Sequence, residues 1–261
     1  MALAAAAAVF LGMSPPPARR AARRTPLLAR ALKPLRALAT RFWVRRDERA
    51  VFDLVYDALP LEREVVLRTY PLVGVPLAFL VAGAAGATQG TASDLLAMLL
   101  FTACIYMPVL LMHVPASESH AARWLLETHP LPEGALAAGV IKAVALRFLV
   151  PLYVLLAALA WAQVGPLFVV RLAVPGCLLS LLVLRALYPT TVHGLPLSVP
   201  PDRIESKFDW GGSLAGYGVV LAGAGVLVNR MMPALAHGLV LIALLLALEV
   251  FSERRLRARL G

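Results

Sequence analysis

Long apolar segments alternate with short polar ones along most of this chain. The clearest case is the pair of apolar runs at 71–87 and 95–114, which are joined by the short, mostly small and polar stretch 88–94. The second run contains no Asp, Glu, Lys or Arg. A helix needs roughly 20 apolar residues to cross the hydrocarbon core of a bilayer, and there its backbone must satisfy its own hydrogen bonds. The pair therefore predicts a hairpin of two membrane-spanning helices.

The same pattern continues along the chain and predicts an all-α, polytopic bundle of about six transmembrane helices. The expected spans are 71–87, 95–114, 140–162, 166–188, 213–228 and 233–251. The first and fifth are short and reach only about 25 Å, so we expect the bilayer to thin or the flanks to extend them. Lys142 and Arg147 have stems long enough to return their charges to the interface, and Glu249 is expected to face the headgroups.

The chain divides into four regions on this pattern. They are a basic, Pro/Ala/Arg-rich N-terminal segment (1–39), juxtamembrane amphipathic helices (40–70), the six-span domain (71–251) and a basic tail (252–261). Residues 1–13 are apolar but short, and no basic residue precedes them as in a signal peptide. A marginal helix and the remnant of a further span are the alternatives for these residues.

Residues 40–70 predict one or two amphipathic helices. Charged residues fall on one side (Arg46, Arg49, Asp53 and Asp57), and apolar residues fall on another (Val44, Val51, Val55 and Leu59). Pro60 should end the helix. Two interpretations are open: an interfacial helix that contacts a partner, and a helix packed on the cytoplasmic end of the bundle.

Composition and charge support a membrane location and give the chain an orientation. Of its 261 residues 60% are hydrophobic, and the net charge is +10, whereas soluble domains are about 45–50% apolar. If the N-terminus is cytoplasmic, the internal segments hold 20 Lys and Arg and the external loops hold one, Arg230. This asymmetry predicts a multi-pass protein of the inner (plasma) membrane with both termini in the cytoplasm. It also favours the lipid bilayer, and no nucleic acid, as the partner of the basic residues.

Prolines and glycines interrupt several of the expected spans. Pro108, Pro151 and the Pro175-Gly176 pair can kink their helices. In the glycine-rich fifth span, the spacing of Gly212 and Gly216 allows another helix to approach closely. A movable helix and tight static packing both fit this pattern.

The sequence offers little catalytic chemistry. The five histidines form no HExxH motif or i, i+4 pair, and neither GxSxG nor a P-loop is present. Cys104 and Cys177 lie in apolar runs and predict no disulfide framework. We therefore expect no enzyme activity, no metal and no cofactor, and no ATP hydrolysis by this chain alone.

Two loops on the expected cytoplasmic side contain short amphipathic segments. In the first, Ser117 or Ser119 can cap a short helix that Pro130 ends, with Trp124 and Leu125 on one face. In the second, Pro200 and Pro201 suit a helix start, and Ile204 and Phe208 are neighbours on one face. Either segment could instead rest on the lipid.

Three stretches carry a resemblance to a known family. DERAVFDLVYDALPLEREVVLRTYPLVGVPLAF, SESHAARWLLETHPLPEGALAAGVIKAVALRFLVPLYVLL and LPLSVPP resemble bacterial ABC exporter permeases of the ABC-2-like kind, over roughly residues 45–200. The resemblance implies a channel-forming subunit that works with a separate cytosolic ABC ATPase. It places an ATPase-docking helix at 117–129, whose candidate contact residues are Ser119, Arg123, Trp124 and Leu125. Trp124 would be the anchor and Arg123 a contact at the rim.

Members of this family are usually longer, so the chain resembles a shortened member. On that basis we expect a homodimer or a pairing with another permease half. Two other classes of function stay open. A non-transporting scaffold or accessory protein would bind anionic lipid or a soluble partner, and an integral-membrane enzyme would need a polar cavity that these residues do not supply.

Overall fold

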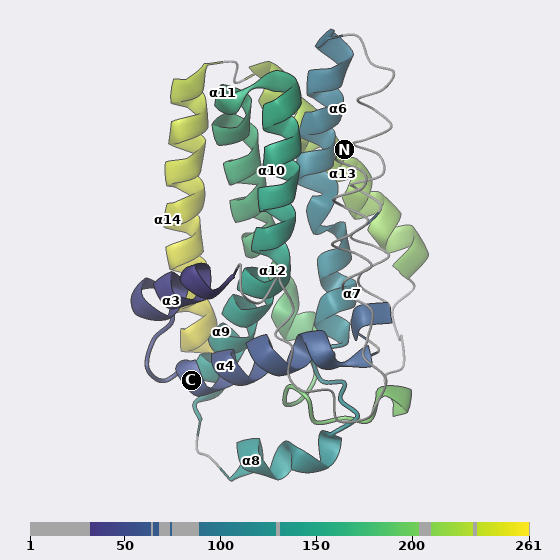
Figure 1. The fold of residues 1–261 in the computed structure, drawn as a ribbon, viewed down its shortest axis with the longest axis vertical. Coiled ribbons are helices and arrows are strands. Elements are labelled where there is room, and N and C mark those ends of the chain that lie inside the picture. Colours follow the sequence, from purple (N-terminus) through teal and green to yellow (C-terminus); the bar gives the residue numbers. More distant parts are fainter. Residues whose placement is uncertain are drawn as a thin grey trace.

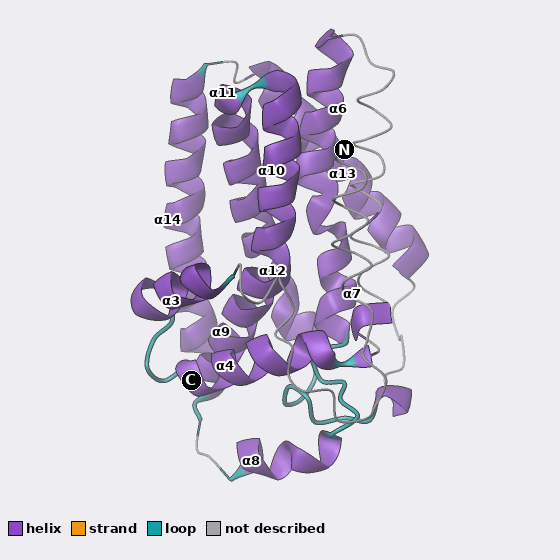
Figure 2. Ribbon diagram, viewed as in Figure 1, coloured by secondary structure: helices purple, strands orange, loops and turns teal. Residues whose placement is uncertain are grey.

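The protein is almost entirely helical in the residues that its structure describes. The computed structural model describes residues 32–63, 65–67, 74, 89–128, 131–203, 210–231 and 234–260. In those ranges the only β-type pairing is an isolated bridge between Ala116 and Val199 (Figure 2). Four helices are long and apolar enough to cross a membrane: Ser93–Met112, Glu133–Val164, Pro166–Thr191 and Leu235–Arg259. The all-α prediction is confirmed, and the chain is a helical membrane protein.

The first and fifth expected spans, 71–87 and 213–228, are not among these four helices. The segment 71–87 lies outside the described residues, apart from Gly74. The fifth span corresponds to α13 (Trp210–Met231), a helix of 22 residues that is not among the four. A total of six spans therefore stays a prediction.

The centre of the bundle is an antiparallel pair of long helices. One consists of α9 (Glu133–Val144), η4 (Ala145–Leu149) and α10 (Val150–Val164). The other consists of α11 (Pro166–Phe168), η5 (Val169–Ala173) and α12 (Val174–Thr191). Gly165 joins them with a φ of 104°, a left-handed conformation that glycine adopts without strain.

Further helices flank this pair (Figure 1). On one side α14 (Leu235–Leu260) packs against α12 and α9. On the other side, α13 packs along α6 (Gln89–Thr102), which continues through η2 (Ala103–Tyr106) into α7 (Met107–Met112). Residues 252–260 of the expected basic tail are helical and continue α14, and this segment has no helix-breaking residue.

Two amphipathic helices precede the described spans. They are α3 (Lys33–Phe42) and α4 (Arg49–Ala58), and η1 (Leu59–Leu61) follows α4. Pro60 lies in η1, so the α-helix ends where predicted. The α3 helix begins within the region 1–39, earlier than the sequence suggested.

The α4 helix lies across one end of the bundle, which we call the α4 end (Figure 1). Its Val51, Phe52 and Val55 are each at most 1% exposed, and α4 packs against α9. Leu59, the first residue of η1, is also fully buried. Of the two interpretations of this segment, α4 follows the second, a helix packed on the end of the bundle. The α3 helix differs, because its Leu38 and Phe42 are exposed.

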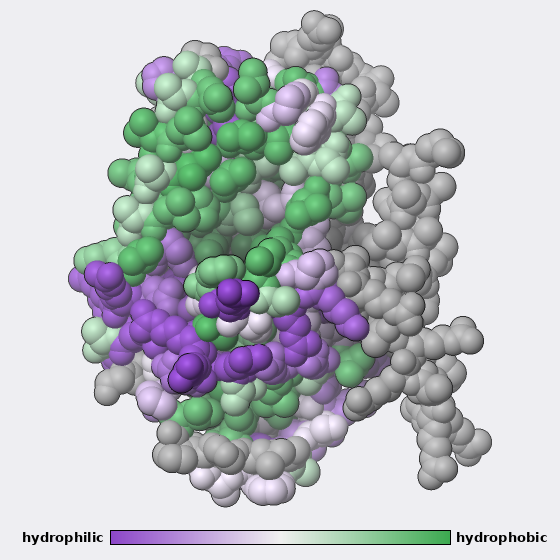
Figure 3. All heavy atoms as spheres, turned by 60° about the vertical axis from the view of Figure 1, so that its left-hand side comes forward, coloured by the Kyte–Doolittle hydropathy of each residue, from purple (hydrophilic) through white to green (hydrophobic). Residues whose placement is uncertain are grey.

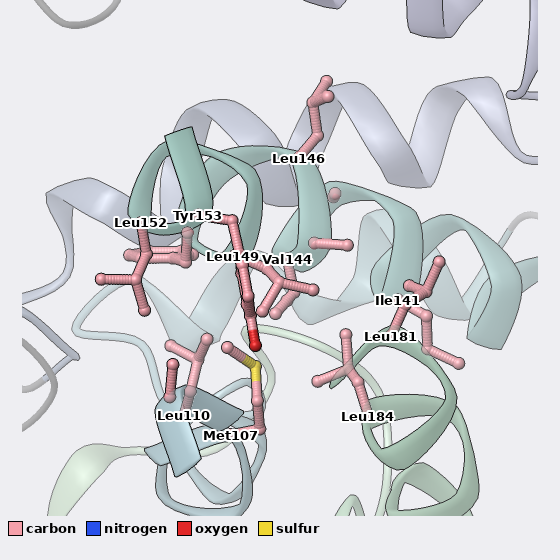
Figure 4. Packing of buried hydrophobic residues seen from close by; sticks show 14 of the residues in the cluster. Met107, Leu110, Ile141, Val144, Leu146, Leu149, Leu152, Tyr153, Leu181 and Leu184 are labelled. Carbon is pink, nitrogen blue, oxygen red and sulfur yellow. The ribbon is translucent and has the colours of Figure 1, made fainter. Parts of the chain in front are cut away.

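The core is centred where α7, α9, η4 and α12 meet (Figure 4). Met107 and Leu110 of α7 lie near Tyr153 of α10, and Leu184 of α12 lies near Ile141. The hydroxyl of Tyr153 donates a hydrogen bond to the carbonyl oxygen of Leu100 (2.5 Å) and lies 2.8 Å from Oγ of Ser180. This buried polar contact joins α6, α10 and α12.

Two central helices contain the same pattern, Arg-x-x-Val-Pro, at 147–151 and 171–175. In each, a π-helical turn holds the arginine and ends two residues before the proline. A proline lacks an N–H group, and its ring clashes with the carbonyl four residues earlier, which here belongs to Arg147 or Arg171. The wider π turn lets the helix continue past the proline. Pro108 similarly follows the 3₁₀ turn η2, so the structure confirms irregular helix at all three proline sites.

The surface supports the membrane assignment. Figure 3 shows a largely hydrophobic face above a band of hydrophilic residues at the level of α3 and α4. Many large apolar side chains of α14 are exposed, among them Leu239, Val240, Leu244 and Phe251. Lipid chains cover such a surface in a membrane protein.

The close contact between α13 and α6 depends on glycines other than the predicted pair. A Cβ atom on Gly225 would lie 2.6 Å from the carbonyl oxygen of Ala97 and 3.2 Å from Cβ of Phe101. Gly216 is exposed, and no described atom lies within 4 Å of its Cβ position. The surroundings of Gly212 are outside the described side chains. A packing role for Gly212 and Gly216 therefore stays a prediction, and it would involve a helix other than those described.

Gly225→Ala should destabilise the protein by about 1–3 kcal/mol, because the new methyl group would overlap a backbone carbonyl. Gly223→Ala is the matched control on the same helix, since nothing lies within 4 Å of that position. Unfolding of the purified protein in mild detergent would measure both. Equal stability of the two variants would contradict the α13–α6 contact.

Candidate functional site at the α4 end of the bundle

A short helix projects beyond α4 at this end of the molecule (Figure 1). It consists of η3 (His120–Arg123) and α8 (Trp124–Glu127), which together we call the loop helix. Trp124 is 57% exposed. Arg123 and Glu127 form an exposed i, i+4 ion pair of 3.3 Å. The short helix predicted in this loop is present.

The predicted docking residues lie on or beside the loop helix. Ser119 directly precedes it, and Ser119, Arg123 and Trp124 are all exposed. The side chain of Leu125 is outside the described side chains. Three of the four residues are therefore accessible to a partner.

The base of the loop helix is hydrogen-bonded to Glu62, which directly follows α4 and η1. The hydroxyl of Ser117 donates a 2.6 Å hydrogen bond to Glu62, and the backbone N–H of Glu118 donates a 3.0 Å hydrogen bond to the same carboxylate. The Ser117 hydroxyl also accepts a 3.0 Å hydrogen bond from the backbone N–H of Ser119, directly before η3, as a residue that caps the helix start would. No local sequence pattern could have identified Glu62, because its partners are 55 and 56 residues away.

The two loops at the α4 end also pair with each other. The N–H groups of Leu197 and Val199 donate to the carbonyls of Val114 and Pro115, and Ser117 N–H donates to Val199. These bonds are 2.9–3.0 Å long. The second loop continues into η6 (Pro201–Arg203), whereas the predicted neighbours Ile204 and Phe208 lie outside the described residues. The two loops therefore form one unit.

A buried lysine connects α4 to the spans. The side chain of Lys142, in α9, is 1% exposed, and its ammonium donates hydrogen bonds to three acceptor groups. They are the carbonyl of Trp43 (2.8 Å), Glu48 (2.9 Å) and Glu253 (2.9 Å). The expectation that Lys142 extends to the headgroups is wrong, because carboxylates from two other segments satisfy the ammonium inside the protein.

Further charges surround this lysine. Arg185 of α12 forms an ion pair with Glu249 of α14 and lies 3.8 Å from Glu253. Arg257 contacts Glu48 and lies 3.2 Å from Asp47. Glu249 is only 6% exposed, so the expectation that it faces the headgroups is also wrong. We call the following six residues the charge network: Glu48, Lys142, Arg185, Glu249, Glu253 and Arg257.

The charge network is electrically balanced, with three cations and three carboxylates. A single charge at this position would be strongly destabilising, whereas close pairing compensates for its loss of water. The backbone permits the approach because position 139 is glycine. A Cβ atom there would lie 3.0 Å from the carbonyl of Glu48 and 3.2 Å from Cβ of Val51.

A smaller polar chain lies at the opposite end of the bundle. Arg171 donates a hydrogen bond to Asn229 (2.5 Å), Asn229 donates to Asp94 (2.8 Å), and Arg230 pairs with Asp94 (2.7 Å). It joins η5, α13 and α6. Polar contacts thus join helices at both ends of the bundle.

The structure offers an apolar cavity and no evident catalytic centre among its described residues. The cavity has a volume of about 280 Å³ and lies between η2 and α7, α12 and α13. Ile105, Pro108, Leu187 and Tyr217 are among its lining residues. In the described part of the chain, no three His, Cys, Asp or Glu residues are grouped so that they could hold a metal ion.

Comparison with known proteins gives no relative: no protein-family model matches the chain, and no curated protein or solved structure is significantly similar to it. The resemblance to exporter permeases therefore stays a prediction. A functional proposal has to be argued from the geometry of the α4 end.

Lys142→Met should destabilise the protein by about 3–5 kcal/mol, because the fully buried Glu48 and the largely buried Glu253 would lose their shared cation. Arg123→Ala is the control, since it breaks an exposed pair and should cost less than about 1 kcal/mol. Thermal unfolding in detergent at pH 7 would compare them. Similar midpoints for the two variants would show that the charge network contributes little.

Proposed function

We propose that the chain is the membrane-spanning permease subunit of an ATP-driven, ABC-type exporter that depends on a separate ATPase. The observation that carries this proposal is the loop helix, which projects from the bundle with Trp124 exposed and whose base is hydrogen-bonded to Glu62, directly after α4 and η1. Exposed tryptophan and arginine side chains are the commonest anchors of protein interfaces. A helix in this position suits the docking of a motor protein at the α4 end.

The contacts at the α4 end supply a route from the loop helix to the spans. A displacement of the loop helix would act on α4 through Glu62. The α4 helix would in turn act on α9 and α14 through Glu48, which contacts Lys142 and Arg257. Closure of an ATPase dimer would thereby shift packed helices relative to each other, a common form of conformational switching.

The irregular turns give the spans places at which to bend. The π turns η4 and η5 and the 3₁₀ turn η2 each interrupt a long helix within the bundle. The cavity lined by Pro108 and Tyr217 lies beside one of them. A transport path would form when this chain pairs with a second copy or with another permease half, and exposed Gly216 on α13 offers a site of close approach.

The proposal orients the α4 end towards the cytoplasm. The basic residues of the expected internal segments support this orientation. The loop helix would then face the compartment that holds ATP, as a docking helix must.

Trp124→Ala should abolish the association with an ABC ATPase, because it removes the exposed anchor. Trp161→Ala is a matched control, since Trp161 is 60% exposed near the opposite end of the bundle. The tagged variants would be purified from their native membranes, the ATPase identified by mass spectrometry and ATP hydrolysis measured. The proposal would be wrong if the wild-type chain brought no ABC ATPase with it. Equal recovery with Trp124→Ala would remove the docking role of the loop helix.

A reporter inserted at Gln163 should be exposed outside the cytoplasm, and one inserted at His193 should be inside. The two positions lie at opposite ends of the helix pair α10–α12, and the distribution of basic residues sets the direction. Paired alkaline phosphatase and green fluorescent protein fusions would report each location. Fluorescence from the Gln163 fusion would reverse the orientation and exclude docking of a cytosolic motor on the loop helix.

A further inference from the structure

Arg147 differs from the other arginines within the central helices. Its Nη1 atom is buried and has no hydrogen-bond partner among the described residues, and no described carboxylate forms an ion pair with it. Arg171, which has the same place in the second Arg-x-x-Val-Pro pattern, bonds to Asn229. Arg185 also has a buried nitrogen without a hydrogen bond, Nη1, but its guanidinium pairs with Glu249, whereas Arg147 has no ion pair with a described residue. Arg147 is therefore a cation that still requires an anionic acceptor.

The position of Arg147 along its helix corresponds to the edge of the bilayer. From Val164, at the opposite end, Arg147 is 17 residues away along α10 and η4, which is about 25 Å of helix. The hydrocarbon core is about 30 Å thick, so Arg147 lies within about 5 Å of the edge of the core on the α4 side. Its long side chain can bring the guanidinium to the level of the headgroups. Trp161, 60% exposed, marks the other boundary.

A stripe of accessible apolar residues begins at this arginine. Val150, Val154, Ala158 and Trp161 follow Arg147 at helical spacing, and each is partly or fully exposed. Val154 is 63% exposed. The helix thus presents a charged group at headgroup level with a continuous apolar surface extending from it towards the opposite end, which matches the shape of a phospholipid.

The aromatic and charged residues near Arg147 favour an anionic headgroup. The guanidinium groups of Arg147 and Arg36 lie 5.5 and 4.8 Å from the centre of the Tyr56 ring. Burial lowers the pKa of Arg36, but hydrogen bonds to Asp53 and Asp57 outweigh this effect and raise it, so Arg36 stays charged. Because Asp53 and Asp57 are balanced by Arg36 and Arg49, the charge of Arg147 is the one left for a ligand among these residues.

We propose that Arg147, positioned by the η4 turn and the Tyr56 ring, binds the phosphate of an anionic phospholipid whose acyl chain lies along Val150 and Val154. The guanidinium would donate hydrogen bonds to the phosphate oxygens, a geometry to which it is well suited. The site goes beyond the proposed transport function and does not depend on it. A bound lipid would fix α9–α10 against α3 and α4.

Native mass spectrometry of the full-length protein in mild detergent can test this site. Titration with phosphatidylglycerol should give a defined bound lipid, and Arg147→Gln should weaken its affinity by about tenfold. Arg41→Gln is a matched control, because Arg41 is exposed and also lies 5.5 Å from an aromatic ring, that of Phe42. It should change the affinity less than about twofold, because an exposed charge is well screened.

Two further measurements on the wild-type protein make the test independent of the variants. Phosphatidylglycerol should raise the melting temperature more than phosphatidylcholine at the same concentration, and inorganic phosphate should have no effect up to millimolar concentration. The proposal is overturned if Arg147→Gln binds phosphatidylglycerol as tightly as the wild type or if the two lipids act equally. An equal effect of inorganic phosphate would assign the site to a free anion instead.

Discussion

The buried pairing of Lys142 with Glu48 is the constraint on which the α4 end of this protein depends. A lysine ammonium in a long apolar helix is destabilising unless acceptors from other segments reach it. Here they come from the residue that precedes α4 and from α14, and a backbone carbonyl completes the set. Satisfying one charge therefore determines where three separate parts of the chain meet.

This constraint makes the amphipathic helix part of the membrane domain. The apolar face of α4 is buried against the bundle. The charge network fixes the position of α4 along α9, because the ion pairs form only at one register of the two helices. Gly139 permits the short distance between the two backbones. The base of the loop helix is hydrogen-bonded to Glu62, which follows α4 through the short turn η1. A force applied at Trp124 would thus meet hydrogen bonds and ion pairs rather than a flexible connection.

The sequence predicted the elements better than it predicted the contacts between them. The spacing of apolar residues and the length of the apolar runs identified the helices of the bundle and the amphipathic face containing Val51 and Val55. The proline itself identified the break at Pro60. They could not identify the charge network, because Lys142 and Glu253 are 111 residues apart and no local pattern links them. One signal was available: cations and carboxylates occurred within the expected spans, where isolated charges are rare and pairing is the usual solution. The helical continuation over 252–260 was missed because basic composition was taken to mark a tail.

The two Arg-x-x-Val-Pro turns show how one local pattern can acquire different roles. In each pattern the π-helical turn holds the arginine and lets the helix continue past the proline two residues later. At 171 a neighbouring helix provides Asn229, so the turn becomes a fixed joint between helices. At 147 the described chain provides an aromatic ring and no acceptor. The same backbone irregularity thus leaves one arginine satisfied by the protein and the other facing the membrane, where lipid phosphate is the most abundant anion.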